Sequence, residues 1–310
     1  MKQLKKTIGS VLWRLKTSRL PDCENMWPLP YKIKGAMRLY EKKMGYSFDF
    51  YHPVLFTEKL QYYRVMYDRP DFPNVVDKYL FKSYIAEKLG DGYTIPLYGA
   101  WQTVDGLREV WDQLPNELVL KSTLQSDGKC IKIIRDKSSV RFDELANELE
   151  KWLVPKNTLI NSYCRAYAKA TPRILAEEYM AQIDDQLYDY KVFCFNGVPH
   201  CFYVATDHFP GQLSHISFYD PNWDRLNVRY GEHPNCDVEK PAHFDEMLRI
   251  AEKLSEGFPF LRVDFFDVGE KVYLSELTLY PGAGQTPYHP ESFNQELGDL
   301  FILPTETMEG

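Results

Sequence analysis

The sequence lacks the features of several common protein classes. No stretch of its 310 residues approaches the roughly 20 consecutive apolar residues that a transmembrane helix needs. The first residues also lack the apolar run and cleavage site of a secretory signal, so we expect a cytoplasmic protein. The six cysteines form no CxxC pair, which favours reduced thiols over a disulfide framework or a zinc site.

Several catalytic motifs are missing as well. There is no GxxxxGK(S/T) phosphate loop, and the seven histidines form no HExxH pattern. No Ser-His or Cys-His arrangement is evident, and no DxD motif of a nucleotide-sugar enzyme is present; the nearest acidic pair is Asp184-Asp185. The sequence therefore offers no evident candidate for a side-chain nucleophile.

Charge is divided unevenly along the chain. The net charge of −7 argues against general nucleic-acid binding, so we expect no nucleic-acid partner. Residues 1–50 nevertheless carry 11 Lys/Arg and 4 Asp/Glu, a net charge of +7. This asymmetry predicts a separate surface task for the basic end.

The basic end begins with an amphipathic pattern. Apolar residues recur at helical spacing over residues 1–16, and no acidic residue occurs through Leu20. A helix of this kind can lie in an anionic membrane interface, so peripheral contact through residues 1–20 at the inner face of the membrane is one hypothesis. A helix packed on the body of the protein, or a loose terminus, is the alternative. The prolines within residues 21–31 predict a linker.

The rest of the chain mixes both kinds of secondary structure and predicts an α+β fold. We expect helices at residues 73–89, 142–153 and 244–254, and strands at 95–101, 118–122, 130–134 and 174–180. Two antiparallel hairpins are also expected. One joins residues 190–195 to 200–205 through an Asn196-Gly197 turn, and the other joins 260–266 to 272–279.

Polar side chains fall on matching positions of the second hairpin. Alternate residues of a strand share a face, so Arg262 lies beside Asp264, and Glu276 beside Thr278. Carboxylate oxygens are ligands that Mg²⁺ prefers, and Mg²⁺ also recruits phosphate oxygens. The alternative is an ordinary polar surface on a half-exposed hairpin.

Three further segments carry candidate binding residues. Lys121 ends an apolar strand and is followed by the polar segment 122–129, which contains Gly128 and could hold phosphate. Glu177 and Glu178 stand at the end of another expected strand, where backbone groups could contact a base. Lys191 lies on an otherwise apolar strand and is expected to have a specific partner.

Taken in order, these segments resemble a known family. The series Asp77-Lys78, Lys121 and its loop, Glu177-Glu178-Tyr179-Met180, Asp189-Tyr190-Lys191, Arg262-Val263-Asp264 and Glu276-Leu277-Thr278 is similar to that of ATP-grasp enzymes, specifically the TupA-like (teichuronopeptide biosynthesis) branch. The resemblance covers about residues 50–305. It implies a nucleotide between two α+β subdomains, with ATP and Mg²⁺ as cofactors.

The resemblance also implies roles for individual residues. The α- and β-phosphates would contact Lys78 and Lys121, under a loop containing Ser126 and Gly128. The adenine would be bound by Glu177 with backbone groups of Glu178 and Met180, and the ribose by Asp189 or, as a weaker alternative, Asp184. The γ-phosphate would be approached by Lys191, the transferring groups stabilised by Arg262, and the metal held by Asp264, Glu276 and Thr278. Thr278 departs from the family, in which many relatives have Asn at this position.

The implied division of the chain is an extension and linker (1–50), the N-terminal part of the ATP-grasp region (51–115), a subdomain with the phosphate loop and adenine strand (116–182), a subdomain with the metal site (183–305) and a tail (306–310). The implied activity is ATP-dependent ligation of an amine to a carboxylate, with a carboxylate-bearing glycan or sugar, such as a uronic acid of a bacterial surface polysaccharide, as substrate. A phosphotransferase, a glycosyltransferase and a non-catalytic nucleotide-binding partner are the alternatives.

Overall fold

The computed structural model describes residues 28–123, 130–154, 165–167, 171–180, 188–206 and 213–304. Its helices are α2 (Leu29–Met44), α3 (Phe56–Met66), α4 (Phe72–Val76), α5 (Leu80–Leu89), α6 (Val104–Val110), α7 (Phe142–Leu153), α9 (Phe244–Ser255) and α10 (Glu291–Leu300). Its strands are β1 (Leu97–Trp101), β2 (Leu118–Ser122), β3 (Ile131–Ile134), β4 (Ile174–Glu177), β5 (Asp189–Phe195), β6 (Val198–Thr206), β7 (His215–Tyr219), β8 (Arg225–Leu226), β9 (Arg229–Tyr230), β10 (Phe260–Val268), β11 (Lys271–Thr278) and β12 (Tyr288–His289). The predicted α+β class is confirmed.

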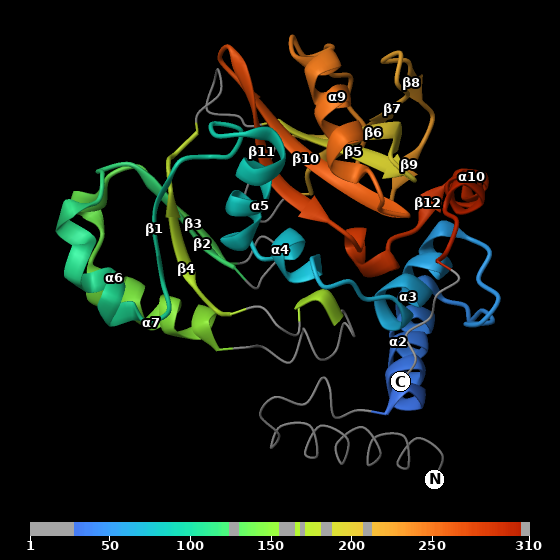
Figure 1. Cartoon of the computed structure of the whole chain (residues 1–310), viewed down its shortest axis with the longest axis horizontal. Coiled ribbons are helices and arrows are strands. Elements are labelled where there is room, and N and C mark those ends of the chain that lie inside the picture. The colour runs from blue at the N-terminus through green and yellow to red at the C-terminus, as the bar shows by residue number, and fades with distance from the viewer. Residues whose placement is uncertain are drawn as a thin grey trace.

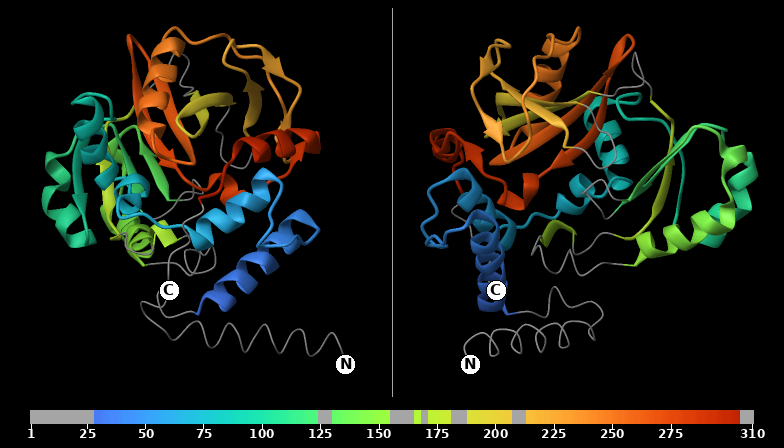
Figure 2. Two further views of the ribbon diagram at one scale, coloured as in Figure 1. Left: turned by 45° about the vertical axis from the view of Figure 1, so that its right-hand side comes forward. Right: turned by 180° about the vertical axis from the view of Figure 1, so that it is seen from behind.

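The strands form two main antiparallel sheets. A small sheet has the order β1-β4-β2-β3, and a large sheet has the order β11-β10-β5-β6-β7-β8. Figure 1 shows α6 and α7 on the side of the small sheet that faces away from the large sheet, with α4 and α5 between the two sheets. The view from behind in Figure 2 shows the same arrangement.

Each sheet has its own hydrophobic core. In the small sheet, alternate residues of β2 and β4 point to α6 and α7 and are fully buried there: Leu118, Leu120, Ile174 and Ala176. In the large sheet, Phe202 packs against Phe244 of α9 with ring centroids 4.8 Å apart. The opposite face of each sheet is therefore left to the residues in between, which include most of the predicted site residues.

The two predicted hairpins form as expected. Strands β5 and β6 pair antiparallel around Asn196 and Gly197, whose φ angles of 50° and 83° are those of a type I′ turn. Strands β10 and β11 pair as the second hairpin, and β10 also pairs with β5. The two hairpins thus lie side by side in one sheet, which brings their polar residues onto adjacent strands.

Two predicted elements differ from the structure. The single helix predicted at 73–89 is divided into α4 and α5, because the chain leaves the helical conformation at Asp77 (φ −79°, ψ 115°). The Asp77 carboxylate accepts hydrogen bonds from the backbone N–H groups of Tyr79 and Leu80 and so caps α5. The strand predicted at 174–180 ends at Glu177.

Candidate active site

One row of polar side chains crosses four strands of the large sheet. Asp264 of β10 is paired with Lys191 of β5 on one side and with Glu276 of β11 on the other, and Lys191 is paired with Tyr203 of β6. Directly paired residues of an antiparallel sheet point to the same face. Because Phe202 points to α9, the adjacent Tyr203 places this row on the opposite face of the sheet.

Asp264 is the centre of a buried ion-pair network. Its Oδ1 accepts a hydrogen bond from Arg262 Nε at 2.7 Å, and its Oδ2 accepts from Arg262 Nη2 at 2.6 Å and Lys191 Nζ at 2.7 Å. Lys191 also pairs with Asp189. Asp264 is fully buried, and the loss of both cations would leave its charge uncompensated. Burial opposes ionisation of Asp264, but Arg262 and Lys191 outweigh it and lower its pKa.

Arg262 is fixed by more than its carboxylate. Its Nη2 also donates to Thr278 Oγ1 at 2.9 Å, and its Nη1 donates to Tyr203 Oη at 3.3 Å. The pKa of Lys191 is raised, since its pairs with Asp189 and Asp264 outweigh the effect of burial. Both cations therefore stay charged and are held in fixed positions by Asp189 and Asp264.

The metal-ligand candidates lie together on β10 and β11. Among the described residues, no three His, Cys, Asp or Glu side chains gather as a complete metal site. Mg²⁺ is bound instead by one or two carboxylates together with water and substrate phosphates. Asp264 keeps a lone pair on Oδ1, and Glu276 accepts no hydrogen bond from any residue that the structure describes. These two carboxylates fit Mg²⁺ in company with phosphate, whereas Thr278 is already bonded to Arg262.

A second buried cluster lies on the small sheet. Glu177 Oε2 is 2.7 Å from Lys121 Nζ, and Glu177 Oε1 is 2.6 Å from Lys82 Nζ of α5. Leu120 and Ala176, directly before Lys121 and Glu177, point to α6 and α7, so the cluster lies on the face turned toward α5. Burial raises the pKa of Glu177, but the two lysines outweigh this effect and lower it below its usual value.

Comparison with known proteins identifies the fold family. The family model described as TupA-like ATPgrasp matches residues 58–302, which is more than half of the chain. The chain belongs to the TupA-like ATP-grasp family.

Two solved structures are similar to this chain at low sequence identity. The D-alanine–D-alanine ligase from Helicobacter pylori has 15% sequence identity over 74% of this chain and 61% of that chain, with a TM-score of 0.42. The N5-carboxyaminoimidazole synthase from Aspergillus clavatus has 13% identity over 66% of this chain and 44% of that chain, with a TM-score of 0.38. The chain thus spans about three fifths of the length of the ligase. No curated protein matches it.

Apart from Lys78, the predicted site residues of this ATP-grasp chain fall into three groups. On the large sheet the structure brings together Asp189, Lys191, Arg262, Asp264, Glu276 and Thr278. On the small sheet it brings together Lys121 and Glu177, with Glu178 and Met180 following β4. Outside the described residues lie Ser126, Gly128, Asp184 and the basic segment 1–20.

The predicted position of Lys78 within a helix is wrong. Lys78 lies at the break between α4 and α5 and not inside a helix, because Asp77 caps α5. The buried Asp77 Oδ2 also accepts from Arg173 Nη1 at 3.1 Å, which ties this break to the residue before β4. Lys78 is therefore placed by a fixed turn between the two sheets.

Three residues of the clusters were missed by sequence reasoning. Lys82 lies four residues after Lys78, so the helix predicted at 73–89 would have placed both lysines on one face, which is a signal that helical spacing could have supplied. Tyr203 and Arg173 had no such signal, since their partners, Arg262 of β10 and Asp77 at the break before α5, are distant in the sequence.

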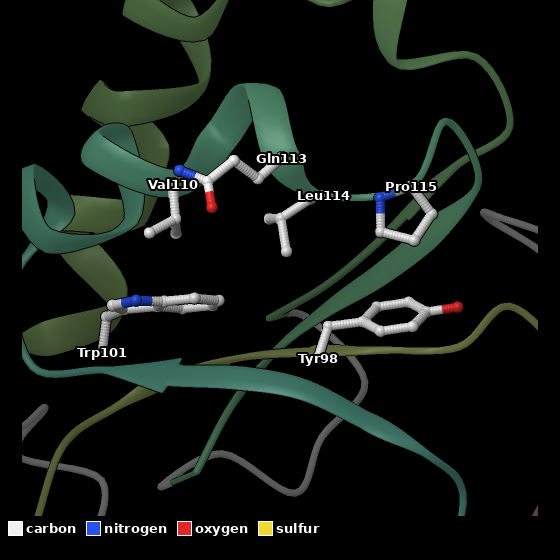
Figure 3. Close-up of a pocket in the computed structure, with 6 residues that line it drawn as sticks. All are labelled: Tyr98, Trp101, Val110, Gln113, Leu114 and Pro115. Atoms are coloured by element: carbon white, nitrogen blue, oxygen red, sulfur yellow. The ribbon is translucent and has the colours of Figure 1, made fainter.

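A pocket of about 400 Å³ lies elsewhere, between β1 and the segment after α6. Figure 3 shows Tyr98 and Trp101 below this pocket and Val110, Gln113, Leu114 and Pro115 around its upper side. Trp101 packs against the hydrophobic core between the small sheet and helices α6 and α7. The pocket therefore lies on that face of the small sheet, opposite to the face that carries Glu177. It contains none of the predicted site residues.

Proposed function

We propose that this chain is an ATP-dependent carboxylate–amine ligase that works through an acyl phosphate. The observation that carries the proposal is the row Lys191, Asp264 and Glu276 with Arg262 beside it. Two fixed cations and a carboxylate without a hydrogen-bond partner among the described residues suit phosphoryl transfer, which depends mainly on positioning and charge neutralisation. Membership in the ATP-grasp family supports the same reading.

The small sheet and the turn before α5 would supply most of the nucleotide site. Lys121 and Lys78 would hold the α- and β-phosphates, with Ser126 and Gly128 in the loop that covers them. The adenine would be bound by Glu177 and by backbone groups of Glu178 and Met180. Asp189, at the start of β5, would contact the ribose from the large sheet.

The large sheet would supply the chemistry. When bound, Mg²⁺ held by Asp264 and Glu276, with Thr278 as a further predicted ligand, would neutralise phosphate charge. Lys191 would contact the γ-phosphate, and Arg262 would stabilise the charge that develops on the acyl group. A substrate carboxylate oxygen would attack the γ-phosphorus and release ADP. An amine would then attack the carbonyl carbon, release phosphate and lose a proton.

The proposed substrate is a carboxylate-bearing glycan or sugar, such as a uronic acid in a bacterial surface polysaccharide or its precursor, together with an amino acid or another amine. This assignment follows the resemblance to the TupA-like branch. Within the described residues, no helix combines the length and apolar character needed to cross a bilayer. The proposed peripheral membrane contact depends on residues 1–20, and equal liposome flotation after their deletion would contradict it.

The experiment is a phosphate-release assay with ATP, Mg²⁺, glucuronic acid or galacturonic acid, and a panel of amino acids. The proposal predicts release only when carboxylate and amine are both present, with ¹⁸O passing from the labelled carboxylate to phosphate. Phosphate retained on the product would indicate a phosphotransferase, and transfer from a nucleotide sugar without ATP would indicate a glycosyltransferase. ATP binding without turnover under every condition would favour a non-catalytic partner.

A further inference from the structure

Two buried lysines share one carboxylate on the small sheet. The side chain of Lys82 is 12% exposed and that of Lys121 is 16% exposed, and each ammonium group lies within 2.7 Å of a Glu177 oxygen. The carboxylate neutralises one of the two positive charges, so the cluster carries an excess of one. Such an excess, held away from bulk water, favours an anionic ligand.

The two lysines differ in how they are held. Lys82 Nζ donates to the carbonyl oxygen of Ile95 at 2.6 Å in addition to its pair with Glu177. It thereby links α5 to the segment before β1. Lys121 has Glu177 as its partner in the described part of the chain, and it stands at the end of β2, directly before the segment predicted to cover phosphate.

A phosphate bound by Lys121 would draw that lysine away from Glu177. A buried carboxylate that loses its only counter-ion is strongly unfavourable, and this cost would oppose phosphate binding. Glu177 is 5% exposed and has little access to water as a substitute. Lys82 removes this cost, because it remains at Oε1 when Lys121 leaves Oε2.

We propose that Lys82 is a positioning residue that keeps Glu177 neutralised and so allows Lys121 to exchange Glu177 for nucleotide phosphate. This inference rests on the proposed function, since it gives Lys121 a phosphate ligand. Lys82 itself contacts no phosphate in this account. Its effect on binding is therefore transmitted entirely through the charge of Glu177.

A double-mutant cycle tests this dependence. Binding of ATP and of inorganic triphosphate, which has no base to contact Glu177, is measured by calorimetry for the full chain, Lys82→Met, Glu177→Gln and the double variant. Lys82→Met should weaken triphosphate binding about tenfold, because Glu177 then retains Lys121. In the Glu177→Gln background the same change should alter affinity less than twofold. Lys88→Met, on the exposed side of the same helix, is the matched control and should have no effect.

The contrary results are distinct. If Lys82→Met lowers triphosphate affinity equally in the parental chain and in Glu177→Gln, Lys82 acts on phosphate directly. If Lys82→Met leaves this affinity unchanged, the pair between Lys82 and Glu177 is irrelevant to binding. If Lys82→Met fails to fold, Lys82→Gln, which can still donate to Ile95, takes its place in the cycle. If neither folds, Lys82 is a structural residue and the inference is wrong. Failure of the parental chain to bind either ligand would instead contradict the proposed function.

Discussion

Lys191 is held between two carboxylates, and this placement makes its role separable from folding. Asp264 keeps both hydrogen bonds from Arg262 when Lys191 is removed, so the buried carboxylate is not left unpaired. The charge that Lys191 would bring to the γ-phosphate has no evident substitute on β5.

Lys191→Met should therefore reduce turnover about 10²- to 10³-fold, as expected for the loss of one preorganised donor, with a smaller effect on ATP affinity. Single-turnover phosphate release together with calorimetry would separate the two effects. Lys271→Met, at the exposed start of β11, is the control for a lost charge on the same sheet. A parental rate in Lys191→Met would remove Lys191 from the catalytic residues.

Glu177 and Asp264 predict how stability depends on pH. Both have a folded-state pKa below their usual values, because their cations outweigh the effect of burial. The unfolded chain therefore binds protons more readily than the folded chain in acid. The stability that these carboxylates contribute is fully present above about pH 5 and is lost as the pH falls toward the lowered values.

Urea unfolding at pH 7 and pH 4 would measure this dependence. The parental chain should lose more of its free energy of unfolding over this interval than Glu177→Gln, in which one of the two titrating groups is absent. An identical loss in both proteins would contradict the assigned pKa direction of Glu177.

At the scale of the elements, the break between α4 and α5 is set by a single buried side chain. Asp77 caps α5 through its Oδ1 and pairs with Arg173 through its Oδ2. Asp77→Ala removes both contacts and should lower the free energy of unfolding by about 3 kcal/mol. Asp77→Asn retains an oxygen for the cap and loses the charge, so it should cost clearly less. Urea denaturation of both variants tests this, and equal losses would show that the cap contributes nothing.

The turn after β11 depends on close packing as well as on backbone conformation. Gly284 has a φ of +62°, and a Cβ built there would lie 2.5 Å from Gln61 Nε2 and 2.9 Å from the Thr57 carbonyl oxygen. Gly45 has a φ of +85° with nothing near its Cβ position. Replacement of Gly45 by Ala therefore measures the free-energy cost of the left-handed backbone conformation alone.

Gly45→Ala should cost about 1 kcal/mol, and Gly284→Ala about 3 kcal/mol, because the second adds a clash with the backbone of α3. Thermal or urea unfolding of the two variants provides the comparison. Equal costs would mean that the packing of this turn on α3 is looser than the structure has it.

The elements that the sequence predicts best are those with a local cause. The helix predicted at 142–153 agrees with α7 at both ends, because apolar residues recur there at helical spacing and form one buried face. The Asn196-Gly197 hairpin forms because those residues accept positive φ angles. Helix α2 was not predicted; residues 21–31 read as a linker, and only Lys32, Ala36 and Tyr40 of the helix are buried.

The candidate site could be predicted only in part. The pairing of Arg262 with Asp264 and their nearness to Glu276 follow from strand alternation within one hairpin. The neighbours Lys191 and Tyr203 depend on β5 pairing with β10 and β6, which is a long-range contact that spacing does not reveal. The pairing of Lys82 with Glu177 could not be predicted either, because Glu177 lies 95 residues further along the chain.

At the scale of the whole molecule, each sheet holds one half of the proposed site. The small sheet contributes Lys121 and Glu177, and the large sheet contributes Lys191, Asp264 and Glu276. The segment before β1 joins the two sheets, since Leu274 N of β11 donates to the Tyr93 carbonyl oxygen at 2.7 Å. A nucleotide bound to both sheets would engage residues from positions 78 to 278, so metal and nucleotide binding should be coupled.

The most direct measurement is calorimetric titration of ATP, with and without Mg²⁺, into the parental chain, Glu276→Gln and the exposed control Glu270→Gln. The account predicts that Mg²⁺ strengthens ATP binding to the parental chain and the control. Glu276→Gln should weaken binding at least tenfold with Mg²⁺ and leave it nearly unchanged without it, because one charged metal ligand is lost. Absence of ATP binding to the parental chain, or equal Mg²⁺-dependent affinity in Glu276→Gln, would contradict the central claim.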